Sequence, residues 1–371
     1  MALIPFAWVR AAKPLLWPLR VLAARGWLRE ADVDFWLMRL HPALRLNRVL
    51  ARVIRRQWVA QDMLELSLQA NGNWSNAAPG QHLQLFVERD GVRLSRTYSL
   101  TSVQPGGRLQ VAIKHQAGGR VSPYLLEHVA VDDLLELGPV QGDMSWPAAS
   151  ASVLLLAAGS GITPLLGLLR QALVRGFSAP ITLLHYVREQ GQCAFVEELQ
   201  ALQGQYANLQ VQWSLTAVQD EAAMLSGRFN AAHLQALHAV SPGHVLACGP
   251  AGFVSQVQQW WQGAQLPGAL QVEAFSPPAL RTDEGARAVQ LGFARSHQRM
   301  PADNQRSLLE WAEAQGLQPA HGCRQGICAS CTCTLLSGTV RDMRSGVLFS
   351  EPGQPIRLCV SAAHSDVEID L

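Results

Sequence analysis

The sequence predicts three domains in a fixed order: a small antiparallel β-barrel, an α/β domain with a parallel sheet, and a small α+β domain that carries a cysteine cluster. The length of 371 residues suits two or three domains of ordinary size. Short strands with alternating hydrophobicity fill residues 48–147, and an apolar run and a glycine loop open residues 148–275. Residues 285–371 contain five cysteines, four of which have a characteristic spacing. A proline-containing linker, residues 276–284, separates the last two domains.

Residues 1–47 precede the barrel and are expected to form a basic helical arm. The arm contains Trp8, Trp17, Trp27 and Trp36. Residues 1–60 hold eleven Lys and Arg against three acidic residues, a local charge of +8, whereas the whole chain carries only +2, so no nucleic-acid partner is expected. The apolar start comes before the first positive charge, which does not fit a secretory signal, and no charge-free apolar window is long enough to span a membrane.

The composition of the arm allows two interpretations. Tryptophans interleaved with cations suit a membrane interface, where the rings lie at the level of the headgroups and the charges face anionic lipid. Alternatively, the arm packs on the barrel and its tryptophans form part of a core. The sequence leaves both interpretations open.

The barrel is predicted from β alternation at residues 64–68, 83–87 and 109–113, separated by glycine-containing turns. Several short strands at this spacing are typical of a small antiparallel barrel. Two polar runs accompany the strands: Arg96-Thr97-Tyr98-Ser99-Leu100 and Gly118-Gly119-Arg120-Val121-Ser122. An arginine fork suits a phosphate, an aromatic face suits a planar ring, and the N–H groups of a glycine loop at a helix start suit a pyrophosphate.

The α/β domain is predicted from residues 153–158, an uninterrupted apolar run of the kind found in buried parallel strands. Later strand candidates alternate with helical segments, which is typical of a nucleotide-binding domain. Gly159-Ser160-Gly161-Ile162-Thr163-Pro164 follows the first strand. Its glycines permit close backbone approach, and Pro164 suits the first turn of a helix whose N-terminus faces phosphate.

The C-terminal cysteines have the spacing of iron–sulfur ligands. Cys323, Cys328 and Cys331 form C-x4-C-x2-C, and Cys359 follows 28 positions later, as in plant-type [2Fe–2S] sites. A structural zinc site usually pairs two C-x2-C knuckles, and only Cys328 and Cys331 form one. A disulfide framework belongs to small secreted domains, not to a long chain with seven cysteines. We therefore expect all four cysteines to bind a [2Fe–2S] cluster.

Residues 96–100 resemble the R-x-Y-S signature of the ferredoxin–NADP reductase superfamily. The resemblance implies that Arg96 pairs with the flavin phosphate, that Tyr98 stacks on the isoalloxazine, and that Ser99 hydrogen-bonds near flavin N5. Residues 118–122 look like the pyrophosphate segment of the FAD-binding members, which implies FAD rather than FMN.

The α/β domain carries further superfamily motifs. Residues 159–164 resemble the pyrophosphate loop G-x-G-[IV]-[AT]-P, which implies that Gly159, Gly161, Thr163 and Pro164 bind the nicotinamide dinucleotide. Cys248-Gly249-Pro250 resembles the C-G-P motif, which implies that Cys248 lies beside the nicotinamide and shares the hydride-transfer site with Ser99. Phe275 ends a segment similar to the family's E-x-F. Arg188 and Arg228 are expected at the ribose 2′-phosphate, so NADPH is preferred over NADH, because an acidic residue there would favour the free 2′-hydroxyl.

The resemblance covers roughly residues 48–371 in the order flavin, nicotinamide, ferredoxin, and it implies a β-grasp-like fold for the last domain. NADPH gives two electrons at once and the cluster accepts one, so a flavin has to lie between them. The expected protein is therefore an electron-transfer oxidoreductase.

The terminal acceptor is less closely defined. The domain order resembles dioxygenase reductases, and the basic tryptophan-bearing N-terminus most resembles bacterial NADPH-dependent reductases of membrane fatty-acid (acyl-CoA) desaturases. We therefore expect a cytoplasmic protein, peripheral on the membrane through residues 1–47, whose acceptor is an integral-membrane diiron desaturase. Alternative acceptors are a ring-hydroxylating dioxygenase, a membrane hydroxylase and a cytochrome P450. A redox-sensing protein with the same cofactors is an alternative of another class.

Overall fold

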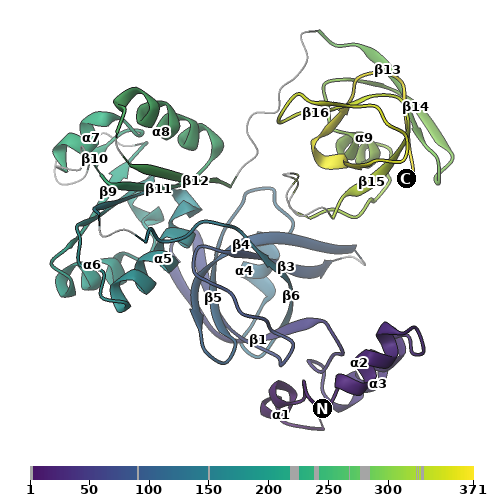
Figure 1. Ribbon diagram of the computed structural model, residues 1–371, viewed down its shortest axis with the longest axis horizontal. Helices are drawn as coiled ribbons and strands as arrows, with labels where there is room; N and C mark the ends of the chain where they lie inside the picture. Colours follow the sequence, from purple (N-terminus) through teal and green to yellow (C-terminus); the bar gives the residue numbers. More distant parts are fainter. Residues whose placement is uncertain are drawn as a thin grey trace. The chain divides into compact units, whose positions relative to one another are not determined.

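The chain divides into two units, Met1–Phe275 and Ser276–Leu371 (Figure 1). The computed structural model describes residues 3–89, 92–148, 151–217, 225–237, 242–266, 268–275, 285–322, 324, 326 and 330–371. The linker expected at residues 276–284 lies outside the described residues.

Six antiparallel strands of the first unit close into a barrel in the order β1-β2-β5-β4-β3-β6. They are β1 (Val49–Ala60), β2 (Met63–Ala70), β3 (His82–Arg89), β4 (Val92–Gln104), β5 (Arg108–Lys114) and β6 (Leu134–Gln141), with α4 (Ser122–His128) between the last two. Alternate residues such as Leu83, Leu85 and Val87 fill the interior because successive side chains of a strand point to opposite faces. The predicted barrel is confirmed.

Three short helices precede the barrel and pack against it. They are α1 (Phe6–Ala11), α2 (Trp17–Ala24) and α3 (Glu30–Leu40), drawn in purple below the barrel in Figure 1. Phe6, Val9, Leu16 and Leu37 form a small core with Leu44, Leu46 and Leu50. Among the described helices, none is both long and apolar enough to cross a membrane.

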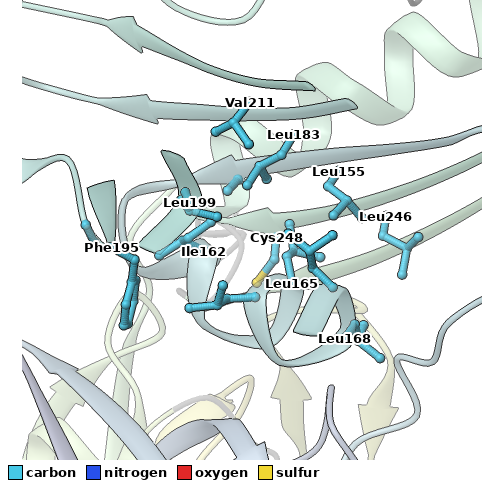
Figure 2. Close-up of a cluster of buried hydrophobic side chains, with 14 of the residues drawn as sticks. Leu155, Ile162, Leu165, Leu168, Leu183, Phe195, Leu199, Val211, Leu246 and Cys248 are labelled. Carbon is cyan, nitrogen blue, oxygen red and sulfur yellow. The ribbon is translucent and has the colours of Figure 1, made fainter. Parts of the chain in front are cut away.

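The second half of this unit is a six-stranded parallel sheet in the order β10-β9-β8-β7-β11-β12. The strands are β7 (Val153–Ala158), β8 (Ile181–Val187), β9 (Leu209–Leu215), β10 (Leu225–Ser226), β11 (His244–Gly249) and β12 (Ala269–Ala274). Helices α5 (Ile162–Val174) and α6 (Val196–Gln205) contribute to one apolar core, and α7 (Ala231–Ala236) and α8 (Ala251–Ala264) contribute to another. The predicted α/β domain is confirmed, and Figure 2 shows the first of these cores.

The second unit contains a five-stranded sheet, β14-β13-β20-β15-β18, and a three-stranded sheet, β17-β16-β19. The elements are β13 (Ala288–Phe293), β14 (Gln298–Asp303), α9 (Leu308–Ala314), β15 (Thr332–Ser337), β16 (Val340–Asp342), β17 (Leu348–Phe349), β18 (Pro355–Arg357), β19 (Ser361–Ala363) and β20 (Val367–Ile369). Ser307 and Glu310 form a capping box that starts α9 by satisfying backbone N–H groups at the helix end. This α+β fold agrees with the predicted ferredoxin-type domain.

Candidate active site

The residues expected to bind the flavin lie on β4, next to β3. Tyr98 is the Cα partner of Leu83, and Ser99 is the partner of His82. Tyr98 packs partly against the barrel core, and its burial raises the pKa of its hydroxyl, so the phenol stays neutral. Ser99 is buried and points to the opposite face of the strand from Tyr98.

The glycine run 118–122 forms a tight turn that leads into α4. Gly118 has φ +72°, and a Cβ added there would meet open space. A Cβ on Gly119 would lie 2.9 Å from the carbonyl oxygen of Gln116, so only glycine fits the turn without a shift. The Ser122 hydroxyl accepts a hydrogen bond from the Gln116 N–H at 3.1 Å. The turn is therefore held at the start of α4.

The dinucleotide loop contacts the C-G-P segment, although the two are far apart in sequence. Residues Gly159–Gly161 form a single turn between β7 and α5. A Cβ on Gly161 would lie 1.9 Å from the carbonyl oxygen of Cys248, so the loop packs directly on the end of β11. The Thr163 hydroxyl donates to the Ser160 carbonyl at 2.9 Å. The structure thus brings together two motifs that the sequence could only place separately.

Cys248 is fully buried, and Figure 2 shows its side chain beside Ile162 and Leu165 of α5. Burial, reinforced by the neighbouring Glu273 carboxylate, raises the pKa of the Cys248 thiol well above its usual range. The side chain is therefore a neutral thiol in an apolar core and not a nucleophile.

Two residues beside the dinucleotide loop were not identified from the sequence. His185 on β8 is buried, and its Nε2 lies 2.9 Å from the Gly159 carbonyl oxygen. Burial lowers the pKa of His185 to about 4, so the neutral ring donates this hydrogen bond. Lys114 of the barrel pairs with Asp62 at 3.3 Å, and its Nζ lies 3.6 Å from the position of a Cβ on Gly159. A cation from the barrel therefore lies beside the Gly159–Gly161 turn.

Polar and glycine contacts fix the nucleotide domain on the barrel. A Cβ on Gly167 of α5 would lie 2.5 Å from the Leu100 carbonyl oxygen, so helix and strand touch through a glycine. Arg170, one turn later, donates to the Thr101 carbonyl at 2.8 Å and through Nε and Nη2 to the Glu198 carboxylate at 2.6 Å. Neither residue was identified from the sequence, because each gains its role only from the other domain.

A second junction lies at the end of β12. Nδ1 of His82 lies 3.1 Å from Oε1 of Glu273, and Glu273 is the Cα partner of Cys248. His82 lies on β3 opposite Ser99 of β4. The contact therefore joins β3, the neighbour of the Ser99 strand, to β12, the neighbour of the Cys248 strand. The Phe275 N–H donates to the Gly249 carbonyl at 2.9 Å, which places Phe275 next to the C-G-P segment.

Arg188 and Arg228 both lie just beyond the carboxyl ends of their strands. Arg188 follows β8, Arg228 follows β10, and β9 separates the two strands. Both side chains are exposed. They occupy the edge of the sheet where ligands of α/β domains bind.

Two of the four expected cluster ligands lie together in the second unit. The sulfur atoms of Cys331 and Cys359 are 3.2 Å apart, beyond the length of about 2.05 Å of a disulfide bond, and both side chains are buried. Gly326 has φ +70° and its carbonyl accepts a hydrogen bond from Arg357. Cys323 and Cys328 lie outside the described residues. Two converging thiols and a glycine-dependent loop fit an iron–sulfur cluster.

The chain matches three domain families, in the predicted order. An oxidoreductase FAD-binding domain matches residues 51–146, an oxidoreductase NAD-binding domain matches residues 155–259, and a 2Fe-2S iron-sulfur cluster binding domain matches residues 293–364. A relative named as the ferredoxin reductase component of 3-ketosteroid-9-alpha-monooxygenase from Mycobacterium tuberculosis is 31% identical over 309 residues, which are 75% of this chain and 82% of that protein. The chain belongs to the ferredoxin–NADP reductase-type flavoproteins with a C-terminal [2Fe–2S] domain.

Other similar proteins cover most of this reductase. An NADPH oxidoreductase of Mycobacterium tuberculosis is 29% identical over 345 residues, 91% of this chain and 88% of that protein. A solved structure of phthalate dioxygenase reductase has the same fold, with a TM-score of 0.60 at 23% identity, over 87% of this chain and 98% of the other. The predicted cofactors, FAD, a [2Fe–2S] cluster and NAD(P)H, are confirmed by the matched domains.

Proposed function

We propose that this reductase takes electrons from NADPH and delivers them singly, by way of FAD and the [2Fe–2S] cluster, to a terminal oxygenase. The observation that carries the proposal is the contact of the dinucleotide loop with Cys248 in a unit that also contains the flavin barrel. Bound FAD supplies the conversion of a two-electron donor into one-electron steps. The name of the 31%-identical relative, a monooxygenase reductase component, supports an oxygenase as acceptor.

The domain boundaries and residue roles belong to the proposal. Residues 48–147 bind FAD, residues 148–275 bind the dinucleotide, and residues 285–371 bind the cluster through Cys323, Cys328, Cys331 and Cys359. Arg96 holds the flavin phosphate, because a guanidinium pairs with phosphate through two parallel hydrogen bonds. Ser99 and Cys248 lie on either side of the reacting atoms, Ser99 as a hydrogen-bonding group and Cys248 as a neutral thiol that shapes the site.

NADPH is the preferred donor. Arg188 and Arg228 provide two exposed cations at the ligand-binding edge of the sheet. The first residue after β8 is Arg188, and the first acidic residue after this strand is Glu189. A 2′-phosphate needs cations, whereas an acidic residue would select the free hydroxyl of NADH. The relative named NADPH oxidoreductase agrees with this preference.

The acceptor is an integral-membrane diiron acyl-CoA desaturase, and residues 1–47 hold the reductase peripherally at the membrane. The support is the arm itself, which is basic, rich in tryptophan and folded against the barrel. A ring-hydroxylating or steroid oxygenase is the second candidate, favoured by the relative that serves a ketosteroid monooxygenase.

Two measurements test the proposal. Purified holoprotein should reduce cytochrome c rapidly with NADPH, and bleaching of the flavin without onward transfer would indicate a redox sensor instead. The acceptor is tested by adding the reductase to membranes that contain an acyl-CoA desaturase and measuring NADPH-dependent double-bond formation. If the reductase does not accelerate desaturation but does support turnover in a steroid or aromatic oxygenase assay, the second candidate replaces the desaturase.

A further inference from the structure

The tryptophans of the N-terminal arm are exposed in the folded protein. Trp8, Trp17, Trp27 and Trp36 each have between 65% and 73% of their surface accessible. All eleven tryptophans of the chain lie in the described residues, and among them Trp58 on the barrel is the only other one that is mainly exposed, at 54%. Leu15 and Phe35 of the arm are exposed as well. We call these six arm residues (Trp8, Leu15, Trp17, Trp27, Phe35 and Trp36) the arm face.

The arm has a buried apolar core that does not include the arm face. The helices already bury Phe6, Val9, Leu16 and Leu37 against the chain that leads into β1. The interpretation in which the tryptophans form this core is therefore wrong, because smaller apolar side chains occupy it.

Polar contacts also lock the arm in place. The Asp34 carboxylate accepts a hydrogen bond from the Leu46 N–H at 2.7 Å and pairs with Arg48 at 3.2 Å. Arg20 donates to the Leu46 carbonyl at 2.9 Å, and Asn71 of the barrel side donates to the Ala43 carbonyl at 3.0 Å. The arm is therefore a preformed platform on the barrel that presents its tryptophans without any need to refold.

The charge around the arm face is positive. Lys13, Arg25 and Arg39 are exposed and form no ion pair with any part of the chain that the structure describes. The guanidinium of Arg39 lies over the ring of Phe35, 4.9 Å from its centroid. The acidic residues of the arm are already engaged, since Asp32 pairs with Arg29 at 2.8 Å, and Glu30 accepts a hydrogen bond from Asn47 at 3.0 Å.

This combination favours a lipid interface. Tryptophan has an apolar ring and a polar N–H, so it favours the headgroup region of a bilayer. Unpaired Lys and Arg beside it are attracted to the negative surface potential of anionic lipid. Protein interfaces are also rich in tryptophan and arginine, but their centre is depleted of charged residues such as lysine.

We propose that the arm face docks the reductase on an anionic bilayer surface by inserting its tryptophans among the headgroups while Lys13, Arg25 and Arg39 contact lipid phosphates. This inference deepens the proposed membrane association by assigning the contact to particular side chains and to anionic lipid. It rests on the proposed function only for the identity of the electron acceptor in that membrane, because binding to lipid does not itself require an acceptor.

The test is flotation of the full-length holoprotein with phosphatidylcholine vesicles, with and without phosphatidylglycerol. Wild type should float with the anionic vesicles at low salt, and its tryptophan fluorescence should shift to the blue. Trp27→Ala should lower the partition about tenfold, the value expected for losing one buried apolar side chain. Arg25→Gln should lower it about fivefold on anionic vesicles only. Trp58→Ala is the matched control, an exposed tryptophan outside the arm, and should bind as wild type does.

The outcomes separate the possibilities. Wild type that stays unbound at low salt, or Trp27→Ala and Trp58→Ala variants that behave alike, would overturn the proposal. If wild type does not bind vesicles but self-associates with rising concentration, and Trp27→Ala abolishes this association, the arm face binds a second copy of the chain instead. All variants should keep NADPH–cytochrome c activity, so a failure of lipid binding remains distinct from a failure of electron transfer. Desaturase reconstitution that fails despite vesicle binding would reject the acceptor and not the arm face.

Discussion

Substitution of Gly167 by alanine should separate two halves of the active site without unfolding either. An added Cβ would lie 2.5 Å from the Leu100 carbonyl oxygen, whereas ordinary contacts begin at 3.4 Å, so α5 and β4 have to move apart by about 0.9 Å. Helix α5 begins at the dinucleotide loop, and β4 carries Ser99. The separation therefore acts on the distance between the nicotinamide and the flavin.

A displacement of about 1 Å between reacting groups can cost roughly a hundredfold in rate. We expect Gly167→Ala to slow the reduction of bound flavin by NADPH by ten- to a hundredfold in stopped-flow absorbance. The free energy of unfolding should fall by no more than about 2 kcal/mol, because an overpacking cost of about 1–3 kcal/mol is partly offset by the gain of about 1 kcal/mol for alanine over glycine in a helix. FAD content and cluster absorbance should stay at the wild-type level.

Gly204→Ala in α6 and Gly263→Ala in α8 are the matched controls, since both positions are helical and a Cβ there meets open space. Both should leave the rate unchanged and keep or raise the melting temperature. If Gly167→Ala behaved like them, with an unchanged rate and a higher melting temperature, the close contact between α5 and β4 would not control hydride transfer.

Four further predictions concern the cofactors and pH. Cys359→Ser should remove the cluster absorbance and cytochrome c reduction but keep ferricyanide reduction by NADPH; loss of both activities with flavin retained would contradict the division of roles. Arg96→Ala should be purified without flavin, because an unpaired phosphate charge is costly to bury, and the cofactor extracted from wild type should run as FAD on chromatography. Arg188→Ala should raise KM for NADPH and leave KM for NADH unchanged, whereas equal changes would remove Arg188 from the 2′-phosphate site. The pKa of His185 is about 4 in the fold against 6.5 in the unfolded chain, so the unfolded state binds the extra proton between these values. The free energy of unfolding should fall by up to about 3 kcal/mol as the pH drops through this window, and urea titrations of His185→Gln should show a shallower pH dependence than wild type.

The sequence determined those features whose chemistry lies within a few neighbouring residues. The cysteine spacing at 323–331 predicts cluster ligands because iron requires several thiolates from one short loop, and the apolar run 153–158 with its glycine loop predicts a buried strand that leads into a phosphate-binding helix. The strand alternation was likewise sufficient for the barrel, because a half-buried strand repeats every two residues. Each of these signals is local and survives without knowledge of the rest of the chain.

The tertiary structure alone decided which distant groups meet. Three contacts join segments that belong to different elements: Gly161 with the Cys248 carbonyl, Lys114 with Gly159, and Arg170 with the Thr101 carbonyl. A single glycine, lysine or arginine carries no periodic signal, so its role is set by a partner that the sequence does not reveal.

The arm shows the same limit most clearly. Its helices carry apolar side chains on more than one face, so hydrophobic periodicity cannot tell which face is buried. Folding against the barrel selected Phe6, Val9, Leu16 and Leu37 for the core and left the four tryptophans in solvent. Burial depends on the shape of the surface that the helices meet, and that surface exists only once the barrel has formed.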